Sequence, residues 1–150
     1  MKYEYFLLDE AISMILEQLE QSKSKEELDK LRRKYGVPSS GEHVNTGVSK
    51  VFNKLKAAGF DRGAWKAPGS QGARLEALGK AKASNWKDGF FLVDNGDLKY
   101  PYISASGKAM VSGVAAAARR AGAHGPKKVA EIASAILEKV NAAEKKSKKK

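Results

Sequence analysis

The chain has 150 residues, of which 42% are hydrophobic and 30% are charged, and it contains no cysteine. This length fits one domain or two small ones and is sufficient to bury a hydrophobic core. The absence of cysteine excludes a disulfide framework, a thiol nucleophile and any cysteine-ligated zinc or iron–sulfur site. No segment approaches the ~18 apolar residues of a membrane-spanning helix, and the N-terminus lacks the apolar core of a cleaved secretory signal. We therefore expect a soluble protein with no membrane partner.

The net charge of +11 is unevenly distributed along the chain. Residues 1–31 hold eight acidic and four basic side chains, a net charge of −4. Residues 32–150 hold nine acidic and 24 basic ones, a net charge of +15. This asymmetry suggests that the body and the C-terminus have a polyanionic partner, typically a nucleic acid. The alternative is that the lysines only keep the protein in solution, and charge alone does not separate the two.

Two helices are expected at the N-terminus. Residues 5–21 carry apolar side chains at helical spacing, and residues 24–27 have the sequence Ser-Lys-Glu-Glu, a capping box that opens a second helix. Gly36 then ends this helix. We predict a helical hairpin over residues 1–36, joined to the rest by a hinge at residues 36–41.

The middle of the chain is predicted to hold two helices separated by a long loop. Residues 40–43 open the first helix, whose C-terminal cap is Gly59. Residues 60–72 form a loop with Gly, Pro, Arg, Lys and Trp, and a short helix follows at residues 73–81. Loops of this length are more often functional or disordered than idle connections.

Two tryptophans in this region, Trp65 and Trp86, each lie beside a lysine. Such a pair can stack on the bases of a single-stranded nucleic acid. Tryptophan also buries a large apolar area, and the favoured interpretation is that both are core or interface anchors.

The last third of the chain is predicted to contain a β-hairpin and two helices. Two apolar runs, residues 90–93 and 98–103, flank an Asp-Asn-Gly-Asp turn, in which Asn-Gly supplies the positive φ angles of a tight hairpin. An alanine-rich helix is expected over residues 107–121 and an amphipathic helix over residues 126–143. Five lysines among residues 145–150 follow and are expected to be mobile.

The predicted fold is therefore mainly α, a small helical bundle with one β-hairpin near residues 90–103. Its expected units are the N-terminal helical hairpin at 1–36, a helical body at 40–143 that contains the β-hairpin and the C-terminal helix pair, and a basic tail at 144–150.

The segment 98–143 resembles a short helical module of head-assembly and other structural proteins of tailed bacteriophages. In that module a Lys-Tyr-Pro strand precedes an Ala-Arg-rich helix, a Gly-containing turn and a final helix rich in Val, Ile and Lys. Residues 99–102 (Lys-Tyr-Pro-Tyr) match the strand, and residues 117–121 (Ala-Ala-Arg-Arg-Ala) match the helix without its usual Asn. Ser104, Ala105 and Ser106 replace the usual acidic or histidine residues. The resemblance implies a viral structural or assembly context and no particular activity.

Residue patterns for catalysis or metal binding are missing from the sequence. His43 and His124 are far apart and have no neighbours at metal-ligand spacing. Residues 69–72 (Gly-Ser-Gln-Gly) lack the Gly-Lys-Ser/Thr ending of a phosphate-binding loop. Acidic pairs such as Asp9 and Glu10 are sequence neighbours, which point in different directions on a helix. We expect a protein that is not an enzyme, with no catalytic residues, no cofactor and no metal.

Two functional hypotheses follow. In the first, the chain is a structural or assembly protein of a tailed-phage virion, located in the virion or the host cytoplasm. It would pack against other virion proteins or against copies of itself, and its basic surface and tail would contact double-stranded DNA or acidic partners. In the second, it is a small basic DNA-binding protein, either architectural or helix-turn-helix-like with residues 122–126 as the turn. The helix after that turn offers few base-reading side chains, which weakens the sequence-specific version.

The residues predicted to contact nucleic acid share a positive charge on a helix, in the long loop or in the tail. They are Lys50, Lys54, Arg62, Lys66, Arg119, Arg120, Lys127, Lys128, Lys145, Lys146, Lys148, Lys149 and Lys150.

Overall fold

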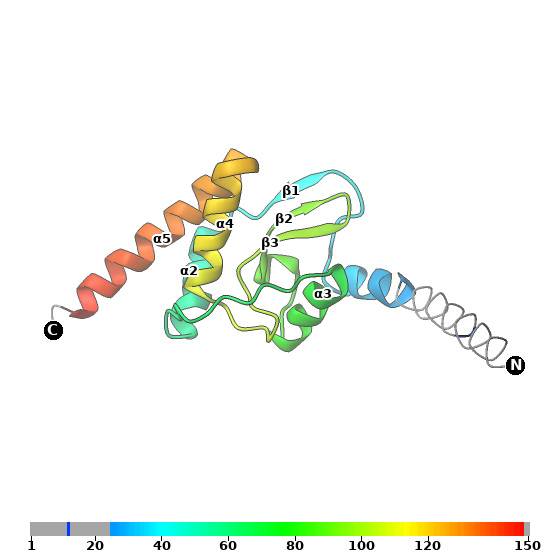
Figure 1. Cartoon of the computed structure of the whole chain (residues 1–150), viewed down its shortest axis with the longest axis horizontal. Helices are drawn as coiled ribbons and strands as arrows, with labels where there is room; N and C mark the ends of the chain where they lie inside the picture. The colour runs from blue at the N-terminus through cyan, green and yellow to red at the C-terminus, as the bar shows by residue number, and fades with distance from the viewer. Residues whose placement is uncertain (1–11, 13–24, 149–150) are drawn as a thin grey trace, which may run out of the picture.

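The computed structural model describes residue 12 and residues 25–148, and their arrangement is mainly α with one small antiparallel sheet (Figure 1). The helix predicted over residues 5–21 lies outside the described residues, apart from Ile12. In chain order the elements are a helix over residues 25–34, β1 (Glu42–Val44), α2 (Val48–Ala57), α3 (Gln71–Lys80), the 3-10 helix η1 (Trp86–Asp88), β2 (Phe90–Asp94), β3 (Asp97–Pro101), α4 (Val111–His124) and α5 (Lys127–Lys148).

The β-hairpin predicted near residues 90–103 is confirmed. β2 and β3 pair antiparallel, with Asp94 opposite Asp97 and Leu92 opposite Lys99. At the turn, Asn95 has a φ of 48° and Gly96 a φ of 85°. Positive φ at both central residues is the geometry that Asn-Gly was expected to supply, because it matches the twist of the two strands.

The helix predicted to open at residues 40–43 is wrong, because residues 42–44 form strand β1 instead. β1 pairs antiparallel with β2, so the hairpin becomes a three-stranded sheet in the order β1-β2-β3. The side chains of Phe90, Phe91, Leu92 and Val93 are all buried, and a strand buried to this extent needs hydrogen-bonding partners along both edges. α2 begins only at Val48.

The remaining helices form close to their predicted positions, with shifted ends. The short helix predicted at residues 73–81 is α3, capped by the Ser70 hydroxyl, which accepts a hydrogen bond from the Ala73 amide. α4 begins at Val111, four residues later than predicted, because a turn over residues 104–107 and a bridge between Ile103 and Ala109 precede it. α5 continues to Lys148, so the segment predicted as a mobile tail begins as helix.

The described elements share one hydrophobic core. α5 packs on α4 and α2, and α3 and α4 each contact β3. The aromatic rings of Phe91 and Tyr102 lie at the centre, with centroids 5.1 Å apart. Figure 1 shows α2, α4 and α5 on one side of the molecule and α3 beneath the sheet on the other. No described helix is both long enough and apolar enough to cross a membrane.

The segment after residue 24 packs against this core. Tyr35 is buried, and Leu28 and Leu31 pack partly against the same cluster. The Arg32 guanidinium also donates to the Gly96 carbonyl in the hairpin turn, at 3.1 Å. The predicted hairpin over residues 1–36 stays a prediction, because its first helix lies outside the described residues.

Candidate functional site

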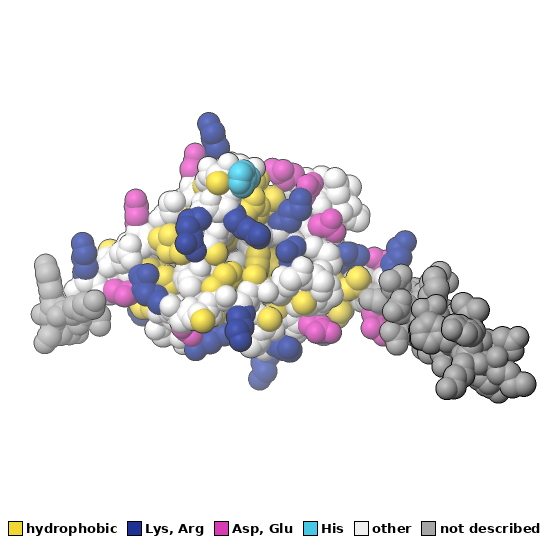
Figure 2. Space-filling view, viewed as in Figure 1, with side chains coloured by type: hydrophobic (Ala, Val, Ile, Leu, Met, Phe, Trp, Pro, Cys, Tyr) yellow, Lys and Arg dark blue, Asp and Glu magenta, His cyan; other side chains and the backbone are white. Residues whose placement is uncertain are grey.

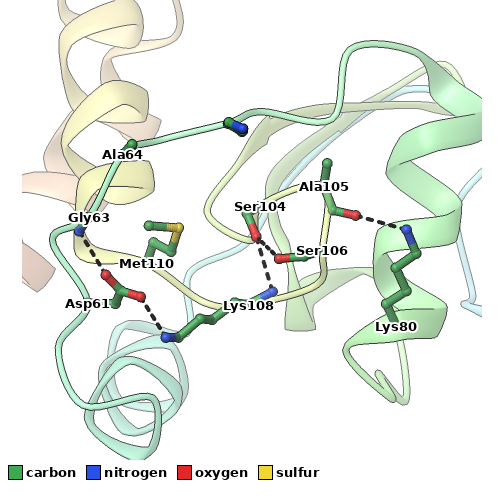
Figure 3. A pocket seen from close by; sticks show the side chains of 10 residues that line it. Asp61, Gly63, Ala64, Lys80, Ser104, Ala105, Ser106, Lys108 and Met110 are labelled. Atoms are coloured by element: carbon green, nitrogen blue, oxygen red, sulfur yellow. Dashed lines mark hydrogen bonds and ion pairs between the residues drawn. The ribbon is translucent and has the colours of Figure 1, made fainter.

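A pocket lies between the loop that follows α2 and the turn that precedes α4 (Figure 3). Several of its polar groups bind one another. The Asp61 carboxylate accepts from the Gly63 amide at 2.7 Å and pairs with the Lys108 ammonium at 2.7 Å. The hydroxyls of Ser104 and Ser106 lie 2.7 Å apart. These contacts connect the loop after α2 to the turn before α4 and stabilise the loop.

The same loop is fixed to the body by two further sets of contacts. The Asp61 carbonyl accepts from the Val111 amide at 2.8 Å, and the Lys66 carbonyl accepts from the Ala105 amide at 3.0 Å. The Trp65 ring lies directly over Gly113 of α4, where a Cβ would stand 2.5 Å from the ring. A loop of this length is thus ordered by its own contacts, and Trp65 is an anchor, as expected.

Two carboxylates are held in their charged form by these and neighbouring contacts. The Lys108 ammonium and the Gly63 amide lower the pKa of Asp61 below its ordinary value of 3.8. Partial burial would raise the pKa of Asp88, but the amides of Ser84 and Asn85 together with Lys54 outweigh it and lower this pKa as well.

Acid should therefore destabilise the fold through these two groups. A carboxyl whose pKa is lower in the folded state contributes stability above its unfolded pKa, and that contribution is lost as the pH falls below about 4. We expect these groups to leave the urea midpoint unchanged between about pH 5 and pH 7. At pH values lower than about 4, the midpoint should decrease. The Asp88→Asn variant should show a shallower fall, measured by urea titration at each pH. An unchanged pH dependence in that variant would contradict the assignment.

A second pocket, of about 320 Å³, lies between α3, β3 and α4 and is lined by basic side chains. We call it the arginine pocket; its lining residues are Arg74, Lys99, Tyr100, Arg120 and His124. Among the residues that the structure describes, no acidic side chain lines it, and all five lining residue types can donate hydrogen bonds. Figure 2 shows basic side chains gathered around a histidine on the face that carries α4 and the hairpin.

Arg74 is built into the wall of the arginine pocket. Its guanidinium donates to the Pro68 carbonyl at 3.1 Å and to the Leu98 carbonyl, so its orientation is fixed. Its half-burial, followed by the nearby positive charge of Arg120, lowers its pKa, while Asp97 acts in the opposite direction. An arginine remains cationic despite such a shift. Two like charges are thus held close together beside solvent.

Tyr100 lines the arginine pocket and has an unusual backbone conformation. Its φ of 55° lies in the left-handed region, which costs a non-glycine residue about 1–3 kcal/mol. Its hydroxyl lies against Gly125, where an added Cβ would overlap it. The Lys-Tyr-Pro strand and the Gly-containing turn after α4 therefore fit together as one packed unit.

The predicted nucleic-acid residues that the structure describes are spread over the surface, and of these only Arg120 lines the arginine pocket. Lys54 pairs with Asp88 at 3.5 Å, and Arg62 pairs with Glu144 at 2.7 Å, so both have structural partners. The remaining predicted residues up to Lys146 are exposed and make no ion pair with another described residue; they are Lys50, Lys66, Arg119, Arg120, Lys127, Lys128, Lys145 and Lys146. Lys149 and Lys150 lie outside the described residues, as does the side chain of Lys148.

Sequence reasoning missed Arg74, Lys99 and His124 as members of a common site. These residues come from three elements that are distant in the chain, so no local spacing could have joined them. One local signal for this site was the Lys99-Tyr100 pair in the phage-like motif, which we interpreted only as part of a strand. Trp86, by contrast, is buried in the core, so it is an anchor and cannot stack on a base.

Among the described residues, no three His, Cys, Asp or Glu side chains are grouped so as to hold a metal ion. No protein-family model, curated protein or solved structure significantly matches the chain.

Proposed function

We propose that this chain is a non-enzymatic structural or assembly protein of a tailed-phage virion, and that its folded basic surface contacts packaged DNA without reading its sequence. In this proposal α2, α4 and α5 act as a small helical bundle that packs against other virion proteins or further copies of the chain. The observation that carries the DNA contact is the arginine pocket, where cationic side chains from three elements converge beside solvent.

The packing of the C-terminal segment supports the phage context. β3, α4 and α5 contact one another in sequence order, and Tyr100 and Gly125 fit together across them. The segment with the phage-like pattern is thus a compact packing unit, as expected of an assembly module. Figure 1 shows the last turns of α5 extending away from the body, where a neighbouring subunit or DNA could reach them.

The geometry gives less support to a helix-turn-helix regulator. α4 ends at His124 and α5 begins at Lys127, which leaves two residues between them, shorter than the usual turn of that motif. The exposed face of α5 carries Glu131 and Glu138, whose charges would be repelled by a DNA groove. Contact with the DNA backbone is therefore favoured over base reading.

The proposal predicts salt-sensitive binding to duplex DNA of any sequence. If about six phosphates are neutralised, the slope of log affinity against log salt is about −5, and affinity falls about a thousandfold between 50 and 200 mM salt. Fluorescence anisotropy with two labelled duplexes of unrelated sequence measures this. Absence of binding at 50 mM salt would contradict the DNA contact and leave the charge to match an acidic protein surface.

A further inference from the structure

The lining of the arginine pocket has the composition of an anion site, and it includes no carboxylate from the described part of the chain. Arg74 and Arg120 bring two guanidinium groups to it, His124 and Tyr100 bring further donors, and Lys99 closes one side. The Lys99 ammonium is also 3.4 Å from the Asp94 carboxylate, so part of its charge is already balanced. Arg74 and Arg120 are therefore the two principal ligands the pocket offers.

Two features indicate that the arginine pocket is preorganised. The backbone carbonyls of Pro68 and Leu98 hold the Arg74 guanidinium in place. The backbone of Tyr100 lies in the left-handed region, and its hydroxyl lies against Gly125. Backbone strain of this kind persists where the surrounding structure demands it, and it is concentrated at binding and catalytic sites. A site already shaped in this way loses little freedom when a ligand enters.

We propose that the arginine pocket binds a backbone phosphate of DNA, with Arg74 and Arg120 as its two guanidinium ligands. This assignment rests on the DNA contact proposed above and names its site. A phosphodiester has two non-bridging oxygens, and each can accept from a guanidinium fork, which is the geometry that makes arginine suited to phosphate. The bound anion would also relieve the repulsion between the two arginines, a gain that a single exposed lysine cannot provide.

The chain offers a matched pair of substitutions for the test. Arg119 and Arg120 are adjacent, exposed and near the end of α4, but only Arg120 lines the pocket. Arg120→Gln and Arg119→Gln remove the same charge and are both expected to fold. For the full-length chain with a labelled duplex at low salt, we expect Arg120→Gln to weaken binding about tenfold and to reduce the salt slope by about one. Arg119→Gln should change the affinity less than about twofold.

A second measurement separates phosphate recognition from a general preference for anions. In an NMR titration of the wild-type protein, inorganic phosphate should shift the Arg120 Nε–H resonance at lower concentration than acetate does. Equal responses to the two anions would overturn the assignment of phosphate.

The outcomes also separate this inference from the proposed function. DNA binding that is equally weakened in the two arginine variants, or unchanged in both, would overturn the pocket while leaving the DNA contact in place. Absence of binding by the wild-type protein would overturn both.

Discussion

Replacing the buried Asn45 by alanine is expected to lower the free energy of unfolding by about 3 kcal/mol. Asn45 is only 2% exposed. Its amide donates to the Lys87 carbonyl at 2.9 Å and to the Phe90 carbonyl at 3.1 Å, and its side-chain oxygen accepts from the Gly47 amide at 3.0 Å. One side chain thus ties β1, η1 and β2 to the start of α2.

The matched control is Tyr102→Phe. The Tyr102 hydroxyl donates to the same Lys87 carbonyl at 2.8 Å, and phenylalanine keeps the buried ring. Because Asn45 still satisfies that carbonyl in this variant, we expect a loss of only about 1 kcal/mol. Urea denaturation of both variants measures the difference. A loss below about 1 kcal/mol for Asn45→Ala would show that the three hydrogen bonds are not needed to hold these elements together.

Two glycines of α4 should respond in opposite directions to the same substitution. Alanine in place of glycine within a helix normally stabilises it by about 0.5–1 kcal/mol. Gly122 has nothing within 4 Å of its would-be Cβ, so Gly122→Ala should show this gain. At Gly113 the added methyl meets the Trp65 ring at 2.5 Å, and we expect Gly113→Ala to lose about 1–3 kcal/mol by overpacking.

Thermal or urea unfolding of the two variants compares these values, and the emission of Trp65 gives a second readout. Displacement of the ring in Gly113→Ala should expose it and shift its emission to the red, whereas Gly122→Ala should leave the emission unchanged. If Gly113→Ala were as stable as Gly122→Ala, the long loop would not be held by its tryptophan.

Local patterns were sufficient for the elements whose signals lie within a few residues. The Asn95-Gly96 turn and the helical spacing of apolar residues in α4 and α5 each place an element to within a few positions. β1 could not be found in this way. Its three residues, Glu42–Val44, become a strand only because β2, some 50 residues later in the chain, presents a free edge.

For the candidate site as well, some features can be predicted from neighbouring residues, and others depend on contacts between distant parts of the chain. The positive charge of the chain and of Arg120 could be read from the sequence. The convergence of Arg74 with Arg120 could not, because it depends on how α3 and α4 pack on either side of β3. The ion pairs of Lys54 with Asp88 and of Arg62 with Glu144 could not be predicted from the sequence either.

The most direct test of the account is whether the folded surface binds DNA when the lysine-rich end is neutral. The variant replaces the five lysines among residues 145–150 by glutamine, which keeps the length of the chain. We expect anisotropy at low salt to show weakened but persistent binding, with a salt slope of about −1 to −2 in place of about −5. Loss of all binding in this variant would contradict the account, because the terminal lysines would then be the whole contact.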